Sequence, residues 1–193
     1  MRKAKQFLWY YWSFIMIVLL QINDDWDKLL PYDVPIDIDI EGYDLTQHGF
    51  GFAFLILTVL FAPLWEEGVF RGIIPWITKK FTQNKWIIFA VSSILFGVAH
   101  LSSGEENAWI QVIYASFIGM YFMGLRLEGK SLWLLIGMHF VINYVSVVTG
   151  DSTIEERAFD LSDFLWTIGA TGLMAVNGIL VMTMKLNKEN FNN

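Results

Sequence analysis

The 193-residue sequence contains no cysteine and few charged residues. The absence of cysteine excludes disulfide bonds, thiolate metal ligands and a cysteine nucleophile. Charged residues make up only 17% of the chain, whereas average globular chains are roughly a quarter charged. Apolar residues account for 55% of the chain. This composition excludes an ordinary soluble domain.

The apolar residues gather into long stretches that carry no charge. Most of them approach the ~20 residues that a helix needs to cross the hydrocarbon core of a bilayer. We expect the first to be a span rather than a cleaved signal peptide, because five more follow it and no A-x-A-like site ends it. No repeat or domain boundary is visible. The sequence therefore predicts an all-α fold, with residues 1–193 forming one polytopic membrane bundle of about six transmembrane helices. The six stretches are 6–23, 49–65, 86–104, 107–125, 131–150 and 164–184.

The charges divide by sign between alternate connections of this bundle. Eleven of the 13 basic residues fall at one set of span ends, and the other set holds most of the acidic residues. By the positive-inside rule both termini are cytoplasmic, and segments 24–44 and 151–163 are external. We expect the acidic segment 24–44 to be a solvated loop, with a cation site as the alternative. The eleven basic residues are Arg2, Lys3, Lys5, Arg71, Lys79, Lys80, Lys85, Arg126, Lys130, Lys185 and Lys188.

Strongly polar side chains within the predicted spans fall into three short clusters. Ionisable groups in a membrane cost several kcal/mol and are functional-site hypotheses by default. Each cluster also has a structural alternative, a salt bridge for the first and interhelical hydrogen bonds for the others. Glu67 and Arg71 are four residues apart and can pair on one helical face, which leaves Glu66 pointing about 100° away. The clusters are Glu66 with Glu67 and Arg71, Phe96 with His100, and His139 with Asn143.

The depth of these clusters in the membrane links them. Counted from the nearest basic residue along a helix that rises about 1.5 Å per residue, Glu66, His100 and Asn143 all lie roughly 20 Å deep. His139 lies one turn shallower, at about 13 Å. We therefore expect Glu66, His100 and Asn143 to converge in a shared polar cavity. This requires the second span to continue past Glu66 as a long, tilted or broken helix.

A carboxylate and a histidine at one level in a dry pocket favour general-base activation of water. A histidine and an asparagine on one face favour oxyanion stabilisation. Other protease chemistries fit poorly, because the spans contain no H-E-x-x-H helix, no aspartate pair and no G-x-S-x-G serine. A divalent metal such as zinc stays open, with Glu66, His100 and His139 as its ligands. Nucleic-acid binding has no support, because the basic residues follow the topology.

The three clusters resemble, in order and spacing, the signature motifs of the CAAX prenyl endopeptidase type II and bacteriocin-processing family, also called CPBP or Abi. The motifs are Glu-Glu-x-x-x-Arg from Glu66, Phe-x-x-x-His from Phe96 and His-x-x-x-Asn from His139. The resemblance covers about residues 61–148. It implies an intramembrane protease in which Glu66 activates water and His100 assists, with or without a metal. It further implies that His139 and Asn143 complete the site and hold the oxyanion, while Glu67, Arg71 and Phe96 support it.

Two hypotheses of function follow. The first is an intramembrane endopeptidase that cuts a membrane-associated peptide or protein, in keeping with bacteriocin processing. The second is a non-catalytic immunity or partner-binding protein on the same fold. The complete motif set favours the first. In either case we expect a multi-pass protein of the bacterial cell membrane, whose partners are the lipid bilayer and a peptide or protein.

Overall fold

The computed structural model describes residues 2–22, 56–101, 108–149 and 161–191, and all regular structure in these ranges is helical. The predicted all-α fold is thus confirmed for the described part of the chain. The acidic segment 24–44 and most of segment 151–163 lie outside the described residues. The elements in chain order are α1 (Arg2–Ile22), η3 (Ile56–Phe61), α3 (Ala62–Glu67), η4 (Gly68–Ile73), α4 (Ile74–Thr78), α5 (Lys85–Val98), α6 (Ala108–Glu128), α7 (Leu132–Thr149) and α8 (Leu161–Phe191).

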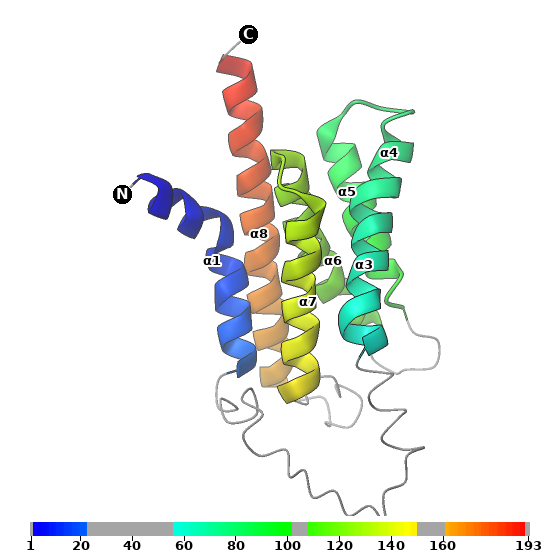
Figure 1. The fold of residues 1–193 in the computed structure, drawn as a ribbon, viewed down its shortest axis with the longest axis vertical. Coiled ribbons are helices and arrows are strands. Elements are labelled where there is room, and N and C mark those ends of the chain that lie inside the picture. The colour runs from blue at the N-terminus through cyan, green and yellow to red at the C-terminus, as the bar shows by residue number, and fades with distance from the viewer. Residues whose placement is uncertain (1, 23–55, 102–107, 150–160, 192–193) are drawn as a thin grey trace, which may run out of the picture.

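The helices lie side by side and alternate in direction (Figure 1). The segment from η3 to α4 forms one continuous rod in which π-helical turns, η3 and η4, precede α3 and α4. The second predicted span therefore does continue past Glu66. The start of α1 and the end of α8 both point toward the end of the bundle that holds the α4–α5 and α6–α7 connections.

Two described segments, Ala108–Glu128 and Thr167–Met184, are long and apolar enough to cross a membrane by length and composition. Three shorter apolar helices accompany them, Gln6–Ile22, Lys85–Val98 and Leu132–Ser146. Large apolar side chains are also exposed along the bundle, including Leu57, Phe61 and Trp65. A soluble monomer rarely exposes so many large apolar groups together, whereas a lipid-facing surface does so by necessity.

The centre of the bundle is α6, which packs most extensively against α8 and α5. Gly124 of α6 lies against Gly178 of α8, and a Cβ added at either position would overlap backbone atoms of the other helix. Small residues permit this close approach of backbones, which is how helices associate in membranes without a hydrophobic driving force. The core beside this contact contains the fully buried Tyr121, Phe122 and Leu135.

Neutral polar groups connect α1 to this core. Asn177 of α8 is fully buried and donates from Nδ2 to Ser13 Oγ at 2.8 Å and to the Tyr10 carbonyl at 3.3 Å. The Tyr121 hydroxyl donates to the same carbonyl at 2.8 Å. Gln21 Nε2 donates to Ser146 Oγ of α7 at 2.8 Å. These bonds give α1 a defined position without burying a charge.

Candidate active site

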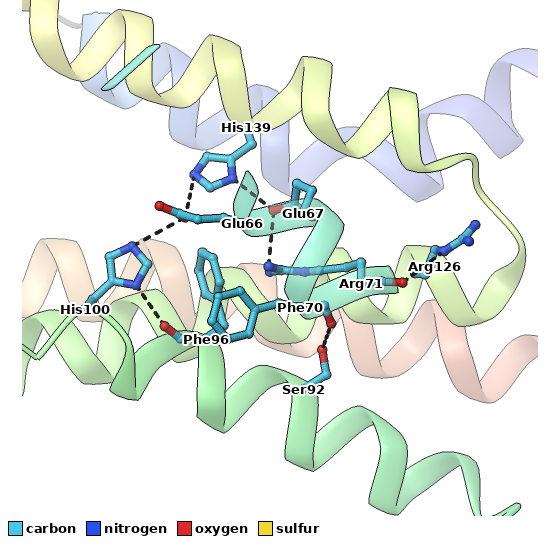
Figure 2. Close-up of polar contacts among 9 residues, drawn as sticks. All are labelled: Glu66, Glu67, Phe70, Arg71, Ser92, Phe96, His100, Arg126 and His139. Carbon is cyan, nitrogen blue, oxygen red and sulfur yellow. Dashed lines mark hydrogen bonds and ion pairs between the residues drawn. The ribbon is translucent and has the colours of Figure 1, made fainter. Parts of the chain in front are cut away.

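Helix α3 carries Glu66 and Glu67 and the π-helical segment η4 carries Arg71, and Pro75 explains the irregular backbone of η4. Proline has no N–H, so the carbonyls four and five residues before it, those of Arg71 and Phe70, lose their helical donor. Two neighbouring helices supply replacements. Ser92 Oγ of α5 donates to the Phe70 carbonyl, and Arg126 Nε of α6 donates to the Arg71 carbonyl at 3.4 Å (Figure 2). Neighbouring side chains often satisfy the freed backbone groups when proline lies in a membrane helix.

Glu67, Arg71 and His139 form a buried charged cluster behind the site. Glu67 and Arg71 have fully buried side chains, and Arg71 Nη1 lies 3.2 Å from Glu67 Oε1. The same oxygen accepts a hydrogen bond from His139 Nδ1 at 2.9 Å. The pairing predicted from the four-residue spacing of Glu67 and Arg71 is confirmed. Glu67 also joins α3 to α7, a link that the sequence did not reveal.

The Arg71 guanidinium lies between two aromatic rings. Its Cζ is 4.0 Å from the centroid of the Phe96 ring and 5.4 Å from that of Phe122. The electron-rich face of an aromatic ring attracts a desolvated cation by roughly 2 kcal/mol or more. Phe96 therefore stabilises the cation that pairs with Glu67, which accounts for an aromatic residue four positions before His100. Phe122 was not predicted from the sequence, because nothing in an apolar stretch distinguishes it from other core residues.

Glu66 lies between two imidazole rings (Figure 2). Its Oε2 is 3.8 Å from His100 Nε2 and 3.7 Å from His139 Nε2. This oxygen is buried and has no hydrogen-bond donor among the described residues. About a fifth of the Glu66 side chain and a quarter of the His100 side chain remain exposed, so the group is reachable from outside the bundle.

Hydrogen bonds on the far side of each ring define the histidine tautomers. His100 Nδ1 lies 2.8 Å from the Phe96 carbonyl and His139 Nδ1 lies 2.9 Å from Glu67. Both partners are acceptors only, so each Nδ1 carries the hydrogen. In the neutral ring, each Nε2 then presents a lone pair toward Glu66. Three basic atoms thus face one another, and a hydrogen-bond donor between them would relieve their repulsion.

Asn143 lies one turn beyond His139 on α7 and contacts the start of the rod. Its Nδ2 donates to the Thr58 carbonyl in η3 at 3.0 Å. The amide group has a second N–H that this bond does not use. Of the three residues predicted to share a cavity, Glu66 and His100 lie together with His139 beside them, while Asn143 contacts Thr58 in η3.

The predicted depth of His139 was wrong by about one turn relative to Glu66. The estimate assumed an α-helical rise from Lys79 to Glu66, but η4 occupies six residues of that segment. A π-helix closes its hydrogen bonds over five residues and packs more residues into each turn. The shorter rise accounts for only part of the difference, and the two side chains span the rest, with Glu66 Oε2 lying 3.7 Å from His139 Nε2.

The donor types at this site match those of zinc enzymes, which use two histidines and a glutamate. Within the described ranges, however, no three histidine, aspartate or glutamate side chains are arranged closely enough to hold a metal ion.

Comparison with known proteins identifies the family. Residues 48–145, which include every side chain of the site, match the family described as type II CAAX prenyl endopeptidase Rce1-like. A protein of uncharacterised function from Mycoplasma capricolum subsp. capricolum is 36% identical over 107 residues, which cover 54% of this chain and 29% of that protein. The chain thus spans under a third of this relative. No solved structure matches. By the family match, this chain belongs to the Rce1-like type II CAAX prenyl endopeptidases, a membrane-embedded family.

Proposed function

We propose that this chain is an intramembrane endopeptidase that hydrolyses a membrane-associated peptide or protein with water activated by Glu66. The observation that supports it most is the placement of Glu66 Oε2, which is buried, faces both Nε2 atoms and has no donor among the described residues. A water molecule in that space would donate one hydrogen bond to Glu66 and be oriented by the imidazoles.

In the proposed reaction Glu66 takes a proton from the water while the oxygen of that water attacks the scissile carbonyl carbon. Protonated Glu66 then delivers that proton to the leaving nitrogen as the carbon–nitrogen bond breaks. His100 accepts the second hydrogen bond of the water and so orients its lone pair. General-base catalysis of this kind contributes about 10²–10⁴ in rate.

The oxyanion of the tetrahedral intermediate needs hydrogen-bond donors. We assign this role to His139 and Asn143. Nε2 of His139 would donate to the oxyanion in the protonated form of the ring, with the carboxylate of Glu67 2.9 Å from Nδ1. Asn143 contributes the N–H that its bond to Thr58 leaves over. Arg71 and Phe96 act indirectly, since they hold Glu67.

The proposed topology has six spans in one domain, with both termini in the cytoplasm of a bacterial cell. The alternating helix directions and the position of Lys79, Lys80 and Lys130 at one end of the bundle support it. The chain has no cysteine, so a single introduced cysteine reports its side of the membrane. In intact cells we expect Asp37→Cys to react with an impermeant maleimide and Lys80→Cys to react only after permeabilisation. The reverse pattern would invert the topology.

Glu66→Gln tests the proposed activity. The amide keeps the shape of the side chain but cannot accept a proton, so turnover should fall by about 10²-fold or more while expression and folding stay unchanged. Cleaved peptide termini in membranes of cells producing each variant would be compared by mass spectrometry. Glu128→Gln on α6 makes the same chemical change outside the site and should keep cleavage. A non-catalytic immunity or binding protein would keep its phenotype in Glu66→Gln and leave its peptide partner uncut.

A further inference from the structure

A second polar site lies toward the end of the bundle that contains the α4–α5 and α6–α7 connections. A cavity of about 370 Å³ opens between the η4–α4 segment and α6. Its described lining does not include Glu66, His100 or His139. The cavity is therefore separate from the proposed site of hydrolysis, although Arg71, which lines the cavity, also pairs with Glu67 behind that site.

The lining of this cavity is positively charged. Lys79 and Arg126 both line it, and the described lining residues include no acidic side chain. Hydrogen bonds to two carbonyls hold the Arg126 guanidinium in place, from Nε to Arg71 at 3.4 Å and from Nη1 to Lys130 at 3.0 Å. A guanidinium has five N–H donors, so three remain for a ligand. The side chain is oriented before anything binds, which lowers the entropic cost of binding.

The rest of the lining is apolar, with Trp76, Met123 and Leu127 around the charged groups. Trp76 is 60% exposed, and Lys80 Nζ lies 3.6 Å above its ring. Phe81 at the end of the rod is exposed as well. Exposed aromatic and lysine side chains mark the headgroup level of a bilayer. The cavity thus has positively charged groups next to apolar side chains. It lies at the depth of the bilayer where the phosphate of a phospholipid meets its acyl chains.

We propose that this cavity binds the phosphate-bearing headgroup of an anionic phospholipid. Lys79 and Arg126 hold the phosphate, and Trp76, Met123 and Leu127 contact the glycerol and the start of an acyl chain. Basic pockets between transmembrane helices recognise anionic headgroups in this way. The ligand is a lipid rather than free phosphate, because half of the lining residues are apolar and a bare phosphate ion would bury none of their surface.

Native mass spectrometry of the full chain in neutral detergent tests the proposal without any activity measurement, so it can fail independently of the proposed protease. The chain would be titrated with phosphatidylglycerol, with phosphatidylcholine and with inorganic phosphate. We expect one phosphatidylglycerol to bind, phosphatidylcholine to bind more weakly because its choline neutralises the phosphate, and millimolar inorganic phosphate not to displace the lipid.

Lys79→Gln should weaken phosphatidylglycerol binding about fivefold, the effect of one cation near a lipid phosphate. Lys79→Arg should restore it. Lys85→Gln is the matched control, since it removes the same charge at the same end of the bundle from a residue that does not line the cavity, and should change binding by less than about twofold. Equal binding of both lipids, equal loss in the Lys79 and Lys85 variants, or displacement of the lipid by inorganic phosphate would each overturn the proposal.

Discussion

Two halves of the bundle bury polar groups in different ways. Around α1 and α8, Asn177, Ser13 and Tyr121 are neutral, and most of their polar atoms are paired with one another or with a backbone carbonyl. Around the rod, by contrast, Glu67 and Arg71 are charged, fully buried and left with unbonded polar atoms among the described residues. A half-satisfied charged network costs more than a neutral one. We infer that the first half stabilises the fold. The second half retains the buried charges of Glu67 and Arg71 because the proposed hydrolysis requires them.

Among the variants that test this difference, Arg71→Met should lower stability the most. Removing the cation leaves Glu67 as an uncompensated buried charge, and loss of one partner of a buried pair costs roughly 3–5 kcal/mol of stability. The free energy of unfolding can be measured by denaturing-detergent titration. The double variant Glu67→Gln/Arg71→Met removes both charges and should recover much of that loss. If the double variant is less stable than Arg71→Met alone, the pair does not act as the structure indicates.

Asn143→Ala should lower turnover by about 10²–10³, the effect of one oxyanion donor. Its bond to Thr58 should contribute little to stability, since hydrogen bonds within membrane proteins average about 0.6 kcal/mol. Asn143→Asp keeps the size but removes the N–H donors, and it should lose activity similarly. Single-turnover cleavage rates at saturating substrate would measure the effect. Full activity of Asn143→Asp would remove the oxyanion role and leave Asn143 as a brace for η3.

Asn177→Ala represents the neutral half, and its effect should be the smallest. It removes two hydrogen bonds, at 2.8 and 3.3 Å, from a site that holds no charge. We expect the free energy of unfolding to fall by about 1 kcal/mol, with turnover per folded molecule unchanged. Thermal unfolding in detergent, together with cleavage assays normalised to folded protein, would test both parts. A large loss of turnover without a loss of stability would show that the halves are not functionally separate.

Local patterns in the sequence predicted the all-α fold of the described residues and the candidate residues of the proposed site. Apolar stretches predicted the helices, and the spacing of Glu67 and Arg71 predicted their pairing. What the sequence did not predict depends on backbone irregularity and long-range packing. The meeting of Glu66 and His139 depends on side chains from two helices, and Phe122 and Ser92 likewise belong to the site only through contacts between helices. Pro75, four residues after Arg71, is a local feature that could have predicted that the carbonyls of Phe70 and Arg71 lose their helical donors.

The proposed mechanism has one central claim, that water attacks the substrate directly and Glu66 takes its proton. Membranes from cells producing the wild-type chain or Glu66→Gln would be incubated in water enriched in ¹⁸O, and new peptide carboxyl termini would be identified by mass spectrometry. The proposal predicts ¹⁸O-labelled termini that appear with the wild-type chain and are nearly absent with Glu66→Gln. The same labelled termini at the same rate in both samples, or none in either, would contradict it.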